Sequence, residues 1–291
     1  MNLVRAGRVL CALLLSLGAC SWTPAPPPPP QANLVVDSGM PSPEEFDLDM
    51  GIFAYPASAA SLTPTWHYWH GAEGGQNSTR LGYAHGAQEA QAILSHLNGL
   101  AQSVGYRVID ESRYRWNVPA GCTNARLGCV YATLERRSAI DLAPLTEGLR
   151  RSLVAQRQNP REAAAFLLRL VQTIPYQVPD EQPFGLLPPA TVMSEKRGDC
   201  DSKSLLLLHL LRTVGIRSLL ISSSAHAHTM LGIAVPSSGQ SFTVGSTRYA
   251  YAETTAQNSP LGFIQPALLS PNDWRTLPMP SEPPRSLRSI P

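Results

Sequence analysis

Hydrophobic positions recur at helical spacing in three segments of the chain and surround a fourth segment almost completely. The three amphipathic segments predict helices at 86–103, 141–156 and 160–174. The fourth segment, 200–213, is apolar on nearly every side, which predicts a buried helix. Gly215 follows it and suits the left-handed turn that often ends a helix.

Short apolar runs typical of strands follow the buried helix. They predict strands at 218–222, 228–235, 241–244 and 248–254, with a last short strand within 273–279. Two earlier runs, 106–110 and 129–134, also have strand character. Helices and strands that are segregated in this way are typical of an α+β fold.

The N-terminus has the pattern of a targeting segment rather than of a folded part. Arg5 and Arg8 precede a short apolar run, Val9–Leu17, which is too short to span a membrane stably. The run ends in Leu17-Gly18-Ala19-Cys20, which resembles the lipobox of bacterial lipoproteins. This resemblance implies that 1–19 are removed and that Cys20 carries lipid. An ordinary signal peptide cleaved nearby is the alternative.

The residues after Cys20 fit a membrane-anchored protein. Residues 20–45 include six prolines between Pro24 and Pro30, which favour an extended tether of ~3.1 Å per residue. Several acyl chains would give stable anchoring in the lipid bilayer. Ser21 rather than Asp follows the Cys, and by resemblance to lipoprotein sorting rules this favours the outer membrane. We therefore expect a cell-envelope protein whose folded part faces the periplasm.

Composition divides the rest of the chain into three parts. Residues 46–135 predict an N-terminal α+β region whose role the sequence does not indicate, and 136–279 predict the main domain. The Pro-rich tail 280–291 predicts disorder. Within the N-terminal region, Trp66-His67-Tyr68-Trp69-His70 alternates like a strand with an aromatic face. A metal site there is the weaker interpretation, because no third ligand follows at a recognisable spacing.

The charge pattern argues against nucleic acid as a partner. The 291-residue chain has 15% charged residues, a formal net charge of +2 and no long cluster of Lys or Arg. Its 43% hydrophobic content is ordinary for a globular protein. Proteins that bind nucleic acid usually concentrate positive charge on one face.

The five cysteines have four expected fates. Cys11 lies in the signal peptide, and Cys20 is the lipidation site. Cys122 and Cys129 are close enough in sequence to close a short disulfide loop in an oxidising compartment; two unpaired small residues are the alternative. Cys200 is left over, and an unpaired cysteine in an exported protein indicates a reactive thiol.

The residues around Cys200 favour catalysis over an inert buried thiol. Cys200 begins the predicted buried helix with Asp199 as its N-cap, so the helix dipole is expected to lower the pKa of the thiol. His226 and His228 both precede an apolar strand, two residues apart, and compete for the role of base. We favour His228 because the apolar run follows it directly. Glu253 is the expected acid that orients the histidine.

Residues 160–265 resemble the transglutaminase-like superfamily of papain-type cysteine enzymes. The resemblance rests on Gly198-Asp199-Cys200-Asp201-Ser202-Lys203 with its helix, the Gly215-Ile216 that follows, His228 with its strand, and Tyr251-Ala252-Glu253-Thr254. It implies a nucleophile helix packed on an antiparallel β-sheet. It also implies that Cys200 is the nucleophile, His228 the general base and acid, and Glu253 the orienting residue. The oxyanion Trp of animal transglutaminases has no evident counterpart, and Tyr176 or Gln172 are candidates for that role.

The resemblance implies an enzyme that opens an amide bond through a thioester. A cysteine protease acting on protein or peptide is the favoured interpretation, because envelope relatives are more often proteases. A transglutaminase, an amidase directed at peptidoglycan and a non-catalytic binding module on the same scaffold, with an envelope protein as partner, are the alternatives. Asp199 and Asp201 are too few for a calcium site, so we expect no cofactor.

Overall fold

The computed structural model describes residues 61–62, 65–69, 78–82, 85–110, 113–117, 126–155 and 157–279, all within the compact unit Val36–Pro291. The predicted signal peptide, Cys20, the Pro-rich tether, Cys122 and the C-terminal tail lie outside these residues, so those predictions stay predictions. Within the described ranges, no helix has the length and apolar character that a membrane span requires.

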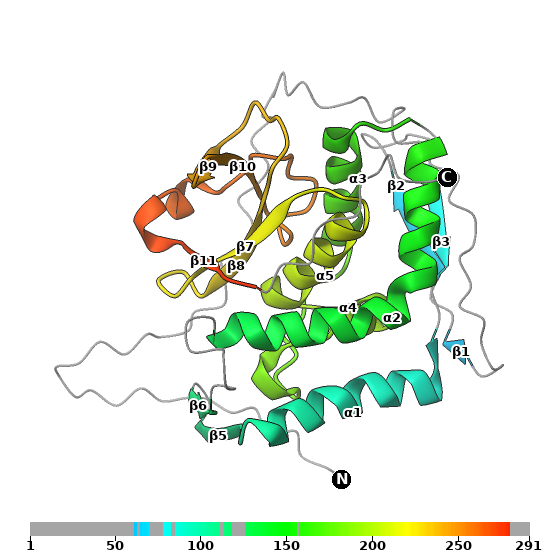
Figure 1. Cartoon of the computed structure of the whole chain (residues 1–291), viewed down its shortest axis with the longest axis vertical. Helices are drawn as coiled ribbons and strands as arrows, with labels where there is room; N and C mark the ends of the chain where they lie inside the picture. Colours follow the sequence, from blue (N-terminus) through cyan, green and yellow to red (C-terminus); the bar gives the residue numbers. More distant parts are fainter. Residues whose placement is uncertain are drawn as a thin grey trace, which may run out of the picture. The chain divides into compact units, whose positions relative to one another are not determined.

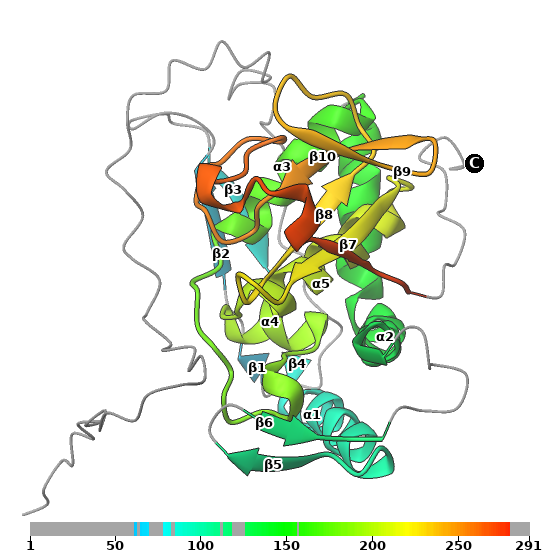
Figure 2. The same cartoon turned by 90° about the vertical axis from the view of Figure 1, so that its left-hand side faces the viewer.

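The C-terminal half of the described chain forms a curled antiparallel sheet of five strands (Figure 2). The strand order is β11-β7-β8-β10-β9, and every neighbouring pair is antiparallel. The strands are β7 (Ser218–Ser223), β8 (His228–Ile233), β9 (Ser241–Val244), β10 (Thr247–Ala252) and β11 (Arg275–Leu277). The predicted strands of this sheet are confirmed, and their ends differ from the predicted ends by at most two residues.

Four helices pack around and beside this sheet (Figure 1). Helix α5 (Cys200–Thr213) contacts β7 and β8 on the sheet side and the three other helices elsewhere. Those helices are α2 (Arg126–Ala155), α3 (Pro160–Gln172) and α4 (Pro189–Glu195). Helix α5 is therefore the central element of the domain, as its apolar pattern predicted.

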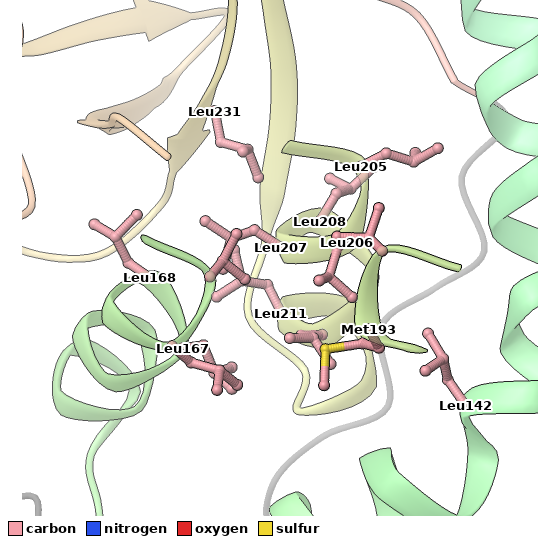
Figure 3. Close-up of a cluster of buried hydrophobic side chains, with 14 of the residues drawn as sticks. Leu142, Leu167, Leu168, Met193, Leu205, Leu206, Leu207, Leu208, Leu211 and Leu231 are labelled. Atoms are coloured by element: carbon pink, nitrogen blue, oxygen red, sulfur yellow. The ribbon is translucent and has the colours of Figure 1, made fainter. Parts of the chain in front are cut away.

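The leucines of α5 explain why this helix is central. Leu205 to Leu208, Leu210 and Leu211 are each at most 1% exposed. Figure 3 shows Leu205 to Leu208 and Leu211 in one cluster with Leu167 and Leu168 of α3, Met193 of α4, Leu142 of α2 and Leu231 of β8. Burial of one such side chain contributes about 1.5–3 kcal/mol, so this cluster holds the start of α5 firmly in place.

The local start signals of α3 also follow from the sequence. Asn159 caps the helix by accepting hydrogen bonds from the backbone of Arg161 and Glu162, and the Glu162 side chain accepts one from the Asn159 backbone. Pro160 occupies the first turn, where its missing N–H is not needed. This capping box fixes the direction in which α3 leaves the end of α2.

The N-terminal region shares the core of the main domain. Helix α1 (Ala87–Ser103) contacts α2 and α4, and its Ile93 and Leu97 belong to the same buried cluster as α5. The region's strands form three two-stranded sheets. They are β1 (Ser61–Leu62) with β4 (His85–Gly86), β2 (Thr65–Trp69) with β3 (Ser78–Gly82), and β5 (Arg107–Asp110) with β6 (Arg113–Arg115).

Two sequence predictions about the helices are wrong. Residues 129–134 are not a strand, because α2 runs through them without interruption and joins the helix predicted at 141–156. Val130, Tyr131 and Leu134 have strand character individually, but their spacing also suits one buried helical face. The expected boundary at 135/136 therefore falls inside α2. Helix α4 is not among the predicted helices, because Pro188-Pro189 suggests a break. Proline nevertheless suits the first turn of a helix, and Pro189 is the first residue of α4.

Candidate active site

Cys200 is the first residue of α5, and its neighbours form the helix start that the sequence predicted. The Asp199 side chain accepts a hydrogen bond of 2.9 Å from the backbone N–H of Ser202, which caps the helix. Gly198, just before it, is bound to the segment Pro175–Gln177 by hydrogen bonds from Gly198 N to Pro175 O and from Gln177 N to Gly198 O. The start of α5, where Cys200 lies, is thus held from two sides.

The Cys200 thiol is nearly buried and lies close to two carboxylates. The residue is 7% exposed, and its sulfur lies within 4.8 Å of carboxylate oxygens of Asp199 and Asp201. Burial raises the pKa of the thiol well above its usual value, the charges of Asp201 and Asp199 raise it further, and a hydrogen bond from the Thr229 backbone lowers it. The prediction of a lowered pKa is therefore wrong, because burial and the neighbouring carboxylates raise the pKa of the thiol.

His228 and Glu253 form the expected pair of base and acid. The Nε2 atom of His228, the first residue of β8, lies 2.7 Å from Oε2 of Glu253, which follows β10. The other carboxylate oxygen accepts hydrogen bonds from the backbone N–H and the hydroxyl of Thr255, at 2.8 and 2.6 Å. Glu253 is 1% exposed, and each of its oxygens has a donor.

The two partners shift each other's pKa in the directions that a charged pair requires. Burial lowers the pKa of His228, but the hydrogen bond and the charge of Glu253 outweigh it, so the net pKa is raised. Burial raises the pKa of Glu253, but its hydrogen bond to His228 and the imidazolium charge make the net pKa lower than usual. With Nε2 bound to Glu253, Nδ1 is the ring nitrogen of His228 that is not engaged by the carboxylate.

The competing histidine has a different partner. His226 lies in the turn between β7 and β8 rather than in a strand, and Ala227 has a left-handed φ of 45°. The two histidines therefore do not lie on the same strand, although they are only two residues apart. The Nε2 atom of His226 lies 3.2 Å from Oδ2 of Asp273. The structure thus distinguishes His228 from His226, which their spacing in the sequence could not do.

Buried Ser204 ties the three chain segments of the site together. Its hydroxyl donates to the backbone oxygen of Thr229, next to His228, and lies 3.2 Å from the hydroxyl of Thr254, next to Glu253. Ser204 and Thr254 are fully buried. One residue of α5 therefore contacts both the segment that carries His228 and the segment that carries Glu253.

Comparison with known proteins places this geometry in a family. Residues 147–259 match the model described as the transglutaminase-like superfamily. These residues form a transglutaminase-like domain. It comprises the end of α2, helices α3 to α5 and the sheet through β10, which is the mixed α+β fold that the resemblance implied. No curated protein and no solved structure gives a significant match to the chain.

Within the transglutaminase-like domain, the two oxyanion candidates lie in different places. The Gln172 amide donates to Glu253 O, Ser259 O and Ser259 Oγ, each at 2.9 Å, so it supports the acid rather than pointing at the thiol. Tyr176 pairs with Gly198 through the backbone bridge. Burial and the charge of Cys200 raise the pKa of Tyr176 to about 12, so its hydroxyl stays a hydrogen-bond donor. Tyr176 is therefore the better placed candidate.

Trp274 lies beyond the transglutaminase-like match but contacts its histidine. The Trp274 and His228 rings meet edge to face with centroids 6.1 Å apart, and the Trp274 and His226 rings are 6.2 Å apart. The indole N–H donates to Leu268 O at 2.8 Å, and Trp274 is 7% exposed. Sequence reasoning missed this residue, because it is 46 positions after His228 and has no motif of its own.

Lys203 is the second residue whose importance the sequence analysis missed. It is 1% exposed, and its ammonium donates to Ile174 O at 2.8 Å. Burial lowers its pKa to about 8, while the charges of Glu253 and Cys200 act in the opposite direction. A signal was present, because positions 200 and 203 share one face of a helix.

One group of side chains could in principle approach a metal ion. Asp199, Cys200 and Asp201 are the cluster of ligand atoms found among the described residues. Calcium takes about six to eight oxygen ligands, far more than two carboxylates supply. The Asp201 carboxylate is also engaged in a hydrogen bond with the buried Tyr131 hydroxyl. We assign no metal to this group.

Proposed function

We propose that the protein is a cysteine-dependent hydrolase of the cell envelope, and that its substrates are proteins or peptides. The observation that carries the proposal is the 2.7 Å pair of His228 and Glu253, placed beside the Thr229 backbone that hydrogen-bonds with the Cys200 thiol. Transglutaminase-like domains include cysteine peptidases and transglutaminases. A cysteine, histidine and acid from three chain segments meet the requirement of that chemistry.

The chemistry begins with a neutral thiol. As Cys200 Sγ attacks the amide carbon, its proton passes to Nδ1 of His228, and Glu253 stabilises the imidazolium. The backbone N–H of Cys200 and the hydroxyl of Tyr176 are the donors proposed for the developing oxyanion. The C–N bond then breaks, His228 returns the proton to the leaving amine, and a thioester remains on Cys200.

The second half of the reaction decides the class of enzyme. Attack by water releases an acid and restores the thiol, which is peptidase or amidase chemistry. Attack by a primary amine forms a new amide, which is transglutaminase chemistry. Both routes use the same three residues, and we favour hydrolysis because envelope relatives of this kind are more often proteases.

The proposed location rests on the N-terminal sequence. Leu17-Gly18-Ala19-Cys20 resembles a lipobox, and the Pro-rich segment after it would separate the domain from the bilayer. We infer lipid anchoring at Cys20, at the periplasmic face of the outer membrane. Labelling of growing cells with an alkyne fatty acid tests this inference, because a Cys20→Ser variant is expected to lose the label.

One observation favours a second candidate function. The Cys200 thiol is nearly buried and its pKa is raised, which would suit a domain that binds an envelope partner without turning it over. The intact pairing of His228 with Glu253 argues against that candidate, because a binding groove has no need of a charged buried pair.

A product analysis separates these functions. The purified protein and its Cys200→Ala variant are incubated with envelope protein extract and a labelled primary amine, and the products are read by mass spectrometry. New peptide termini that require Cys200 support the peptidase proposal and identify the substrate. Incorporation of the amine at Gln without cleavage would replace that proposal by a transglutaminase. Identical products from both proteins would favour the binding module, and a parallel digestion of purified peptidoglycan distinguishes the amidase.

A further inference from the structure

Lys203 is a buried charge that neither folding nor the three proposed catalytic residues explain. The chain contains two lysines, Lys196 and Lys203. Lys203 lies on α5 and is only 1% exposed. Lysine is almost never fully buried unless its charge is paired. The only acceptor recorded for its ammonium among the described residues is the neutral carbonyl of Ile174. This neutral carbonyl does not pair the charge of the ammonium.

Negative groups around Cys200 offset part of the cost of burying this ammonium, although burial still dominates its pKa. Lys203 follows Cys200 by three positions and shares its helix face. The charges of Glu253 and Cys200 both act on its ammonium. The other titratable groups of the site are Asp199 and Asp201 of α5, His228 of β8, Tyr131 of α2 and Tyr176 of the Gly198 bridge.

The stem of Lys203 is also part of the helix start. A Cβ placed on Gly198 would lie 3.4 Å from Cγ of Lys203, so the glycine packs directly against the lysine stem. The ammonium then reaches Ile174 O, at the beginning of the segment that pairs with Gly198. The same side chain thus contacts both segments that position Tyr176 and Cys200.

Resting on the function proposed above, we propose that Lys203 is a positioning residue of the active site whose ammonium offsets the carboxylates around Cys200. Asp199, Asp201 and Glu253 all oppose negative charge on the sulfur. A fixed positive charge one turn along the helix favours the thiolate and the developing oxyanion. Without it, the sulfur of Cys200 would face the charges of Asp199, Asp201 and Glu253 without this positive charge to oppose them.

The pH dependence of thiol reactivity separates a charge effect from a structural one. The rate at which iodoacetamide alkylates Cys200 is measured by peptide mass spectrometry from pH 6 to pH 10 in the full chain. The variants are Lys203→Gln, which keeps a donor for Ile174 O but removes the charge, and Lys196→Gln, which removes the chain's other lysine. Circular dichroism melts establish that each variant is folded.

The proposal makes a specific prediction for the ratio of wild-type to variant rates. At pH 7, Lys203→Gln is expected to react about tenfold more slowly, because a nearby charge shifts a pKa by about one unit or more. The ratio should fall toward one as the pH rises past about 8, where wild-type Lys203 loses its own charge. Lys196→Gln should follow the wild type throughout.

A rate ratio that is the same at every pH, or an unchanged rate in Lys203→Gln, would overturn the proposal. An unreactive wild-type thiol would overturn it as well, since no stabilised thiolate would exist. The alkylation rate of Cys200 can be measured whether or not the protein turns over a substrate. A protein that shows the pH-dependent ratio but forms no product would contradict the proposed function alone, and a protein that forms product without the ratio would contradict the role of Lys203 alone.

Discussion

His228 and Glu253 meet at 2.7 Å, although one begins β8, the other follows β10, and they are 25 residues apart in the sequence. Thr255 holds the second oxygen of the carboxylate, and Gln172 holds the Glu253 backbone. The acid is therefore fixed on both its side chain and its main chain. Such rigid support is what a catalytic histidine needs to keep one tautomer and one orientation.

Replacement of Glu253 by Gln tests this support. The variant keeps the shape of the side chain but loses the charge that stabilises the imidazolium, so turnover is expected to fall about 10²–10⁴-fold. The pKa of His228 should fall as well, because Glu253 is what raises it. Asp273→Asn is the matched control, since it removes the carboxylate beside His226 and should leave the rate nearly unchanged. Equal losses in both variants would contradict the assignment.

The acid limb of the activity profile should report His228. The base must be neutral to accept the thiol proton, and its pKa is raised above the usual 6.5. Activity is therefore expected to increase as pH rises, with a midpoint above 6.5. The measurement is kcat/KM as a function of pH on a substrate identified by the product analysis. A midpoint below 6.5 would mean that a different group limits the reaction.

The two roles considered for Gln172, support of Glu253 and stabilisation of the oxyanion, predict different effects on the stability of the fold. In the structure its amide supports Glu253 and Ser259, so Gln172→Leu leaves buried carbonyl groups without a donor. The expected loss of unfolding free energy is about 2–4 kcal/mol. Chemical denaturation measures it, with the exposed Gln102→Leu as control. Normal stability with a large loss of kcat would instead favour the oxyanion role that the sequence suggested.

Trp274 is expected to contribute to the stability of the fold and to the position of the His228 ring. Trp274→Ala removes a large buried side chain and is expected to cost about 3–5 kcal/mol. Trp274→Phe keeps an aromatic contact with His228 but loses the hydrogen bond to Leu268 O, so it should cost about 1 kcal/mol. Thermal melts give both values, and kcat at fixed pH should follow the same order. A fully active Trp274→Ala enzyme would show that the ring contact has no role at the site.

Lys203 is expected to reduce the stability of the fold at neutral pH. Its folded pKa of about 8 lies below the usual 10.5, so its burial opposes folding below pH 8 and the opposition fades as pH rises toward 10.5. The shift corresponds to on the order of 3 kcal/mol. Lys203→Met recovers this cost but leaves Ile174 O without its donor, which costs about 1 kcal/mol. A net gain of about 1–2 kcal/mol at pH 7, with lower activity, is predicted from denaturant unfolding. A less stable variant with full activity would contradict this account.

Local sequence patterns were enough to predict the elements that carry the site. The leucines of α5 and the apolar runs after it specify a buried helix and a sheet, because both patterns arise from burial itself. Asp199 marks the helix start, and Cys200, His228 and Glu253 follow in the order that thiol enzymes use. The first half of α2 was not predicted, because tertiary burial overrode the strand character of Val130 and Tyr131. Helix α4 was not predicted either.

The electrostatic state of the site depends on contacts that no local pattern encodes. His226 and His228 differ because a left-handed Ala227 places His226 in a turn beside Asp273. The thiol pKa is raised because Asp199, Asp201 and Glu253 converge on a buried sulfur. Trp274 and Asp273 reach the histidines only through the pairing of β11 with β7. These relationships join distant segments, so they become visible only in the folded chain.

The rate of Cys200 alkylation at neutral pH in the wild type, His228→Ala and His226→Ala tests the central claim most directly. The claim is that Cys200 and His228 form one thiol site. It predicts that His228→Ala slows the reaction about tenfold or more, because the proton acceptor is lost, while His226→Ala keeps the wild-type rate. Equal rates in all three proteins, or an equal loss in both variants, would contradict it.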